Sequence, residues 1–238
     1  MRVLVTRPQA EAQALARLLR VLGHVPVACP LLDIRYISAS IDLDGVQALL
    51  FTSGAGVRAF ARLEPHRELP VFAVGDATAA MAREAGFTTV HSAEGDGDAL
   101  VQAVAGALDP KHGAVLHPAG LQVAGDPGAA LAPRGFAYRR LVLYEAIQAV
   151  TLPEEGQAAL ATGALEAVLF FSPRTAEAFV SLVAKAGLVD RCRSLGAYCL
   201  SGAVAAPAVV LPWSALHTAP AQNQQSLLAL LPPGNFRS

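Results

Sequence analysis

Two kinds of segment alternate along the chain, short apolar runs and longer amphipathic ones. The short runs are rich in Val, Leu and Phe and are bounded on both sides, a pattern typical of buried strands. These predicted strands are Val3–Val5, Ala48–Phe51, Val71–Val74, Ala114–Leu116, Leu141–Tyr144, Ala167–Phe171 and Ala197–Leu200.

The longer runs carry Ala and Leu at helical spacing. The predicted helices are Ala10–Leu22, Gly56–Leu63, Thr78–Ala85, Ala99–Leu108, Thr175–Ala186 and Ser226–Leu231. Several are followed by a glycine, at Gly23, Gly86 and Gly187, as many helices are. Helices that alternate with strands predict an α/β fold with parallel sheets.

The sequence also repeats itself weakly. The matching pairs are ALLFTSGAGVRAF from Ala48 with AVLFFSPRTAEAF from Ala167, FAVGDATAA from Phe72 with YCLSGAVAA from Tyr198, VHSA from Val90 with LHTA from Leu216, and Val3 and Leu4 with Val115 and Leu116. The repeat is too long for a solenoid, so it predicts two similar α/β domains of roughly 100–120 residues each.

Two extended segments fall at equivalent places in the two repeats. They are PLLDIRYIS from Pro30 and RRLVLYEAI from Arg139, and both mix apolar with charged residues. We interpret them as paired strands that link the two domains. Two ordinary edge strands are the alternative.

Composition narrows the function. Of the 238 residues 53% are hydrophobic and 16% are charged, which excludes a disordered chain and a coiled coil. The net charge of -1 lacks the basic excess of a sequence-independent nucleic-acid binder, so we expect no nucleic-acid partner. Because the sequence contains no long uninterrupted apolar run and no signal-peptide h-region, we expect no membrane partner and a cytoplasmic location.

The motifs for metal and nucleotide chemistry are missing from the sequence. The three cysteines, Cys29, Cys192 and Cys199, form no CxxC pair and are expected to be buried and reduced. The six histidines lack zinc-ligand spacing, and there is no phosphate-binding loop and no G-x-S-x-G motif. The segment EGDGDAL from Glu94 is interpreted as a loop in which Asp96 or Asp98 caps the next helix. We therefore expect neither a metal nor a cofactor.

Small polar residues recur where a predicted strand runs into a predicted helix. These turns are Thr6-Arg7-Pro8, Thr52-Ser53-Gly54, Gly75-Asp76-Ala77-Thr78, Ser172-Pro173-Arg174 and Ser201-Gly202. They lie at the carboxyl edge of a parallel sheet, where ligands bind, and each offers free backbone N–H groups at the positive end of a helix. Plain N-capping explains any one of them, whereas five together favour an anion-binding cleft.

In the order and spacing of these motifs the chain resembles the uroporphyrinogen-III synthase family. The motifs are VTRP, LLFTSGAGV, VGDATA, LVLYEA, FFSPRTAEAF and YCLSGAVAA, which cover nearly the whole chain. The resemblance implies two flavodoxin-like domains with parallel sheets, joined by a two-stranded β-ladder, with a deep cleft between them. It also implies that residues 1–35 and 147–238 form domain 1, that residues 38–138 form domain 2, and that residues 30–38 and 139–147 are the linkers.

The resemblance implies an activity as well. Members of the family close linear hydroxymethylbilane into uroporphyrinogen III, with inversion of ring D and loss of water, and use neither metal nor cofactor. The family pattern also favours a monomer. The reaction begins when the hydroxymethyl group leaves as water to give an azafulvene, a step that a proton donor assists.

Tyr144 in LVLYEA matches the family tyrosine that has been proposed to assist departure of the hydroxyl, because a phenol is protonated at neutral pH and can donate. A cross-strand aromatic with its hydroxyl in water is the alternative. The turns supply the expected substrate-binding residues, which are Thr6, Arg7, Ser53, Gly54, Gly75, Thr78, Ser172, Pro173, Arg174, Ser201 and Gly202. Arg7 and Arg174 are candidates to pair with substrate carboxylates, with a solvated surface arginine as the alternative for each.

One position departs from the family pattern. Some members carry a pair of threonines in the last turn, where this chain has Ala203 and Val204. That turn is therefore expected to act through backbone N–H groups and Ser201.

Two other functions stay open at this level. A non-enzymatic two-domain protein that closes on an anionic small molecule fits two similar lobes joined by two strands. A receiver-type signalling module would need acidic residues at strand ends to hold Mg²⁺ and accept phosphate. The strand at Ala48–Phe51 is instead followed by Thr52 and Ser53. Turnover of a linear tetrapyrrole separates the synthase from both.

Overall fold

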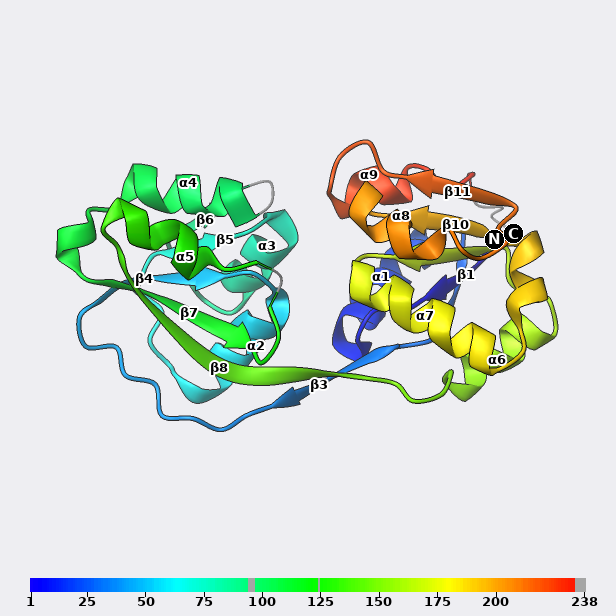
Figure 1. The fold of residues 1–238 in the computed structure, drawn as a ribbon, viewed down its shortest axis with the longest axis horizontal. Helices are drawn as coiled ribbons and strands as arrows, with labels where there is room; N and C mark the ends of the chain where they lie inside the picture. Colours follow the sequence, from blue (N-terminus) through cyan, green and yellow to red (C-terminus); the bar gives the residue numbers. More distant parts are fainter. Residues whose placement is uncertain (94–96, 124, 234–238) are drawn as a thin grey trace. The chain divides into compact units, whose positions relative to one another are not determined.

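The computed structural model describes residues 1–93, 97–123 and 125–233 (Figure 1). The chain divides into two compact units. One comprises Met1–Asp33 with Ile147–Ser238, and the other comprises Ile34–Ala146. We call them the terminal unit and the central unit.

The terminal unit contains a five-stranded parallel sheet. Its strands are β1 (Arg2–Val5), β2 (Val25–Ala28), β9 (Ala167–Phe170), β10 (Gly196–Cys199) and β11 (Ala215–Thr218), in the order β11-β10-β9-β1-β2. Numbered along the chain within this unit, the order is 2-1-3-4-5, which is the flavodoxin-like order.

Helices cover both faces of this sheet (Figure 1). They are α1 (Gln9–Val21) and α9 (Gln224–Leu228) on one face and α6 (Glu154–Ala161), α7 (Pro173–Lys185) and α8 (Gly202–Ala208) on the other, with a 3₁₀ helix at Val189–Ser194. The strands are apolar on both sides because each face packs against helices.

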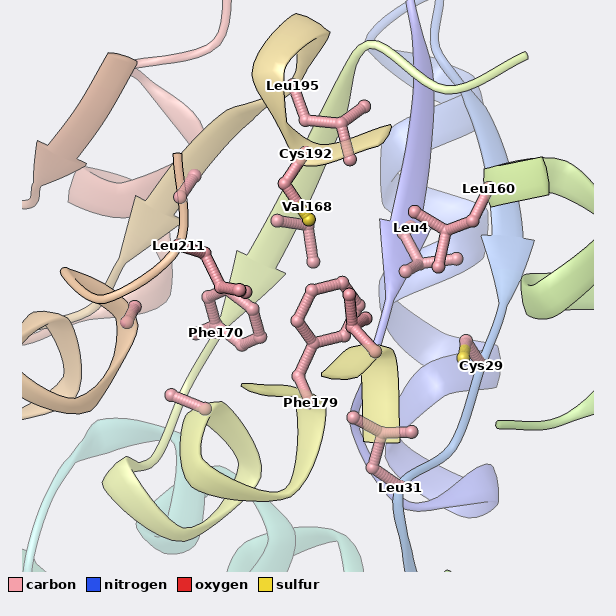
Figure 2. Packing of buried hydrophobic residues seen from close by; sticks show 14 of the residues in the cluster. Leu4, Cys29, Leu31, Leu160, Val168, Phe170, Phe179, Cys192, Leu195 and Leu211 are labelled. Carbon is pink, nitrogen blue, oxygen red and sulfur yellow. The ribbon is translucent and has the colours of Figure 1, made fainter. Parts of the chain in front are cut away.

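Figure 2 shows the larger of the two cores in the terminal unit. Phe170 from β9 and Phe179 from α7 meet edge to face with ring centroids 5.3 Å apart, an arrangement that aromatic pairs favour. Cys29, Cys192 and Cys199 are free and buried, as the sequence predicted. Burial raises the pKa of Cys29 to about 12, so its thiol stays protonated and unreactive.

A six-stranded sheet lies in the central unit. Its strands are β3 (Leu32–Tyr36), β4 (Val46–Phe51), β5 (Val71–Ala73), β6 (Val90–Ser92), β7 (Ala114–Gly120) and β8 (Ala137–Gln148), in the order β3-β8-β7-β4-β5-β6. Two of these strands, β3 and β8, run past the unit's boundaries. The pairs from β8 through β6 are parallel. Helices α2 (Gly54–Leu63) and α3 (Asp76–Glu84) pack on one face, and α4 (Gly97–Ala107) and α5 (Pro127–Leu131) on the other, with 3₁₀ helices at Pro110–His112 and Ala132–Arg134.

The strand registers confirm the internal repeat. Val3 pairs with Ala167 on one side and Pro26 on the other, and its repeat partner Val115 pairs with Ala48 and Tyr138. The sheet β2-β1-β9-β10-β11 therefore corresponds strand for strand to β8-β7-β4-β5-β6. The two units therefore have the same architecture, but the chain reaches the equivalent strands in a different order, since β1 comes first in one unit and its counterpart β7 comes after β4, β5 and β6 in the other.

The predicted strands and helices are all found, with shifts of a few residues at their ends, and the α/β class with parallel sheets is confirmed. Three strands were not predicted, β2, β6 and β11, which are short edge strands with polar residues or a proline. The helices α5 and α6 were not predicted either, and α8 was expected only as a helix after Ser201-Gly202, without bounds. The prediction of Asp98 as a cap was wrong, because α4 begins at Gly97 and Asp98 lies in its first turn. The other candidate cap, Asp96, lies outside the described residues.

The two extended segments form β3 and most of β8, which are hydrogen-bonded neighbours. β8 also pairs in parallel with β7 from Ala137 to Tyr144, so it is an interior strand of the sheet as well as a partner of β3. Within the described ranges, no helix is both long enough and apolar enough to cross a bilayer.

Candidate functional site

The turn from β4 into α2 brings two of the predicted site residues together. Ser53 is the N-cap of α2, and its Oγ accepts a hydrogen bond from the Gly56 N–H at 3.3 Å. The same Oγ lies 2.6 Å from the hydroxyl oxygen of Tyr144, which comes from β8. Tyr144 is 7% exposed, so its hydroxyl faces Ser53 in a largely buried setting.

Close packing around two glycines fixes this arrangement. A Cβ on Gly54 would collide with the end of the Met81 side chain, which would have to move to admit it. A Cβ on Gly120 would lie 2.9 Å from the Tyr144 ring, so the ring packs directly on the backbone of β7. The tyrosine is held from one side by Gly120 and at its hydroxyl by Ser53.

A pocket of about 330 Å³ opens beside this pair at the carboxyl edge of the central sheet. Its walls come from the β4–α2 turn, the end of β5, the first turns of α4, the segment leading into α5, and β8. The lining residues are Thr52, Ser53, Val74, Gly97, Asp98, Val101, Gln122, Val123, Gly125, Asp126, Pro127, Ala130 and Tyr144. The pocket is therefore mostly apolar, and its walls also carry the hydroxyls of Thr52, Ser53 and Tyr144 and the carboxylates of Asp98 and Asp126.

Behind the pocket, a row of hydrogen bonds runs from Thr52 into the sheet. Thr52 Oγ1 lies 3.0 Å from His117 Nε2, and His117 Nδ1 lies 2.6 Å from the Tyr138 hydroxyl. His117 is fully buried on β7. Burial, together with the nearby Arg140 charge, lowers the pKa of His117 to about 4, and burial raises the pKa of Tyr138 to about 12.

His117 and Tyr138 were not predicted from the sequence. The six histidines lack zinc-ligand spacing, and Thr52 occurs in a predicted turn with no chemical signal of its own. A usable signal was present, since His117 immediately follows a predicted buried strand and its repeat partner is Val5. A polar residue that appears in only one copy of a core strand needs an explanation.

The remaining predicted residues of the central unit sit on the neighbouring turn. Gly75 is the N-cap of α3, and Thr78 lies in that helix and is buried. Neither lines the pocket, whereas Val74 beside them does.

The first turn of the terminal unit is already engaged. Thr6 is fully buried and donates its hydroxyl to the carbonyl of Leu169 at 2.7 Å, which ties β1 to β9. Arg7 forms an ion pair with Glu11 at 2.9 Å, and its guanidinium stacks on the Phe171 ring 4.5 Å from the centroid. Arg7 is thus an ordered, half-buried cation.

The other two turns of the terminal unit are helix caps. Ser172 accepts from the Thr175 N–H at 3.2 Å and lies 2.7 Å from the Thr175 hydroxyl, and Ser201 accepts from the Val204 N–H at 3.4 Å. Pro173 and Gly202 are exposed, and Arg174 is half-buried in the first turn of α7. The capping role holds for both serines, and a serine that caps still has a proton to donate.

Comparison with known proteins agrees with this picture. The family model described as uroporphyrinogen-III synthase HemD matches residues 13–229. A uroporphyrinogen-III synthetase from Helicobacter pylori superposes with a TM-score of 0.64 at 16% sequence identity, covering 97% of this chain and 98% of that one. A mutant uroporphyrinogen III synthase from the extremely thermophilic bacterium Thermus thermophilus superposes with a TM-score of 0.52 at 19% identity, covering 96% of each chain.

No curated protein sequence matches the chain significantly. The two superpositions show the shared fold, and the family model covers most of the chain. The family's enzymes are lyases that cyclise hydroxymethylbilane in tetrapyrrole biosynthesis without a cofactor. On this evidence, the chain belongs to the uroporphyrinogen-III synthase family.

Proposed function

We propose that the pocket beside Tyr144 is where this chain carries out the family reaction, the closure of hydroxymethylbilane to uroporphyrinogen III with inversion of ring D and loss of water. The observation that carries the proposal is the 2.6 Å contact between the Tyr144 hydroxyl and Ser53 Oγ in the wall of that pocket. It offers a phenolic proton at a site largely shielded from water.

Tyr144 acts as the acid for the leaving group. The substrate's hydroxymethyl group takes the phenolic proton and departs as water, which leaves an electrophilic azafulvene on the terminal pyrrole. Ser53 turns its O–H toward the phenolate that forms, and the N-terminus of α2 beneath it favours that negative charge. The azafulvene carbon bonds to the substituted α-carbon of ring D to give a spiro intermediate, and the bond from that carbon to the neighbouring methylene then breaks, which leaves a second azafulvene. Ring D attacks this azafulvene through its other α-carbon, and the proton lost there as the pyrrole regains aromaticity returns to Tyr144.

The carboxylates in the pocket suit the same chemistry. Asp98 and Asp126 line it together with Tyr144. The Asp126 carboxylate caps α5 by accepting from Gly128 and Ala129, which holds it in place. Two acidic side chains repel the acetate and propionate arms of the substrate but favour the positive charge that develops on the azafulvene. The pocket therefore receives the reacting pyrrole end, and the arms need other partners.

Those partners are the turns predicted from the sequence. In the central unit we assign carboxylate binding to the N-termini of α2 and α3, at Gly54, Gly75 and Thr78 and at the backbone of Ser53, whose O–H is directed to Tyr144. In the terminal unit we assign it to Thr6 and Arg7 and to the starts of α7 and α8, at Ser172, Pro173, Arg174, Ser201 and Gly202. Because the Thr6 and Arg7 side chains already have partners, their turn contributes chiefly backbone N–H groups.

The expected organisation of the protein is part of the proposal. Residues 1–35 and 147–238 make one domain, residues 38–138 the other, and residues 30–38 and 139–147 the linkers, in a protein that works as a cytoplasmic monomer. Limited proteolysis tests the boundaries, and sedimentation equilibrium tests the monomer.

The first experiment is an isomer assay. The protein is incubated with freshly generated hydroxymethylbilane, the products are oxidised, and type I and type III porphyrins are separated. Closure without an enzyme gives type I, so a sample without protein is the control. We expect mostly type III. Type I alone at the rate of the control would overturn the proposal and favour a binding protein that closes on an anionic small molecule.

A further inference from the structure

Three side chains form a hydrogen-bonded row that is centred on buried His117 and ends at the pocket. Tyr138 on β8 contacts His117 on β7, and His117 contacts Thr52, which follows β4 and lines the pocket beside Ser53. The contacts are 2.6 Å and 3.0 Å long, and His117 at their centre has no exposed surface. A fully buried imidazole with both nitrogens hydrogen-bonded has a fixed ring orientation.

The fold does not require this row. By the strand registers, Thr52, His117 and Tyr138 correspond to Phe171, Val5 and Pro26 in the terminal unit. The same sheet is thus built there with three apolar residues. Burying a polar row is costly unless every member is satisfied, so its presence in one unit only points to a role in the site of that unit.

The protonation of the row follows from its members. His117 is neutral, since burial and the facing Arg140 hold its pKa near 4 against the opposing effect of Asp126, so one ring nitrogen donates and the other accepts. Among the described residues, His117 is the hydrogen-bond partner of the Tyr138 hydroxyl. When the phenol donates to Nδ1, and Nε2 carries the ring proton and donates to Thr52 Oγ1, the phenolic proton has an acceptor and both contacts of His117 are hydrogen bonds.

This direction determines what Thr52 can do. A hydroxyl oxygen that accepts from His117 keeps its own proton for another acceptor. The pocket is the space that Thr52 faces beyond His117, and its acidic lining makes a neutral oxygen a better occupant there than a carboxylate. The oxygen that must be stabilised at this place is the departing hydroxyl of the substrate.

We propose that His117 is a positioning residue which, together with Tyr138, directs the hydroxyl proton of Thr52 into the pocket as a second donor to the departing hydroxyl oxygen. The inference rests on the proposed reaction at this pocket. Tyr144 delivers the proton, and Thr52 stabilises the oxygen as its bond to carbon breaks.

A double-mutant cycle in turnover tests the role of the row. Thr52→Val removes the donor with little change of shape and is expected to lower kcat about ten-fold, the effect of one lost hydrogen bond, with KM unchanged. Tyr138→Phe is expected to lower kcat several-fold, because His117 can then accept from Thr52. The double variant should be no slower than Thr52→Val, since Tyr138 acts only through Thr52.

Two variants serve as controls. Thr52→Ser keeps a hydroxyl and should restore most of kcat. Tyr36→Phe removes a hydroxyl that contacts Arg58 in the same unit at 3.4 Å, and it should leave kcat unchanged. Additive losses in the double variant, a normal kcat for Tyr138→Phe, or a change in KM in place of kcat would each overturn the proposal.

A spectroscopic measurement tests the direction of the row without any turnover. In protein labelled with ¹⁵N at histidine, we expect His117 Nδ1 to resonate as an unprotonated nitrogen and Nε2 as a protonated one. Tyr138→Phe should move both signals toward the other tautomer. The opposite assignment in the wild type would refute the inference. Type I porphyrin in the isomer assay alongside the expected spectrum would reject the proposed function and leave the orientation of Thr52 established.

Discussion

The terminal and central units share five strands in the same order and register and a serine cap on one equivalent helix, yet the row of Thr52, His117 and Tyr138 in the central unit has apolar counterparts in the terminal unit. Their common features include a stacked pair on the same two strands, Phe72 with His91 in the central unit and Tyr198 with His217 in the terminal unit. Ser53 and Ser172 likewise cap equivalent helices. The fold thus accounts for the stacks and the caps.

The contacts that the shared fold does not explain lie in the central unit. Ser53 Oγ contacts the hydroxyl of a buried tyrosine on a distant strand, whereas Ser172 Oγ contacts Thr175 on its own helix. The residue before the cap is Thr52 in one unit and Phe171 in the other. On the proposed mechanism, the difference teaches that a duplicated fold can offer ligand-binding edges in both copies while reactive groups are added to one.

Tyr144→Phe is the change for which we expect the largest difference in turnover from its counterpart in the terminal unit. It removes the proposed proton donor while keeping the ring on Gly120, and we expect turnover to fall about a hundred-fold, within the usual range for general acid catalysis. The measurement is kcat for the type III isomer, with circular dichroism to show that the protein stays folded.

The terminal unit supplies the matched control for this variant. Tyr198→Phe also removes a buried phenol, and it converts the stack of Tyr198 on His217 into the Phe–His stack already present in the central unit. It should leave turnover unchanged. Equal losses in both variants would contradict a special role for Tyr144, and full activity of Tyr144→Phe would remove it from the mechanism.

Much of the fold could be read from the sequence because its dominant signals are local. The apolar strands and the amphipathic helices each carry their own pattern, and the repeat at Ala48 and Ala167 indicated the two-unit organisation. The short strand Val90–Ser92 was not predicted, because three residues with a histidine in the middle give no periodic signal.

The site was harder to predict because its geometry depends on strand order. Ser53 and Tyr144 are 91 positions apart and meet through β7, which lies between their strands. Ser53 and Tyr144 both lie in motifs that resemble the family's, whereas His117 lies in no such motif. Only the strand register shows that His117 lies between Thr52 and Tyr138, and that the other unit has apolar residues there.

Acid should weaken the central unit through His117. Its folded pKa of about 4 lies below the ordinary value of 6.5, so the unfolded chain binds the proton more tightly. Stability is therefore fully present above pH 6.5 and is lost as the pH falls toward 4. Between pH 7 and pH 4.5 we expect this histidine to account for a loss of about 2 kcal/mol in the free energy of unfolding.

Urea unfolding of the wild type and of His117→Asn at both pH values measures this loss. The variant should be less stable at neutral pH and lose about 2 kcal/mol less than the wild type on acidification. Fluorescence of Trp213, the one tryptophan of the sequence, reports the terminal unit, where burial also lowers the pKa of His24, so its pH dependence should be the same in the wild type and in His117→Asn. The same pH dependence with and without His117 would contradict the neutral, buried imidazole.

The smallest contrast is between the two capping serines. Ser53→Ala and Ser172→Ala each remove a side-chain acceptor at a helix start, and each should cost about 1 kcal/mol of stability. Thermal unfolding followed by circular dichroism measures both. Their effects on turnover should differ, because Ser53 also contacts the Tyr144 hydroxyl, whereas the loss of Ser172 Oγ frees the Thr175 N–H for a carboxylate.

We therefore expect a several-fold lower kcat for Ser53→Ala and a kcat close to the wild type for Ser172→Ala. If Ser172→Ala nearly abolished turnover, its hydroxyl would be doing more than capping, and the reactive groups would not be confined to one unit. If both variants kept full activity, the N-terminus of α2 alone would suffice to support the phenolate, and Ser53 would be a cap like its counterpart.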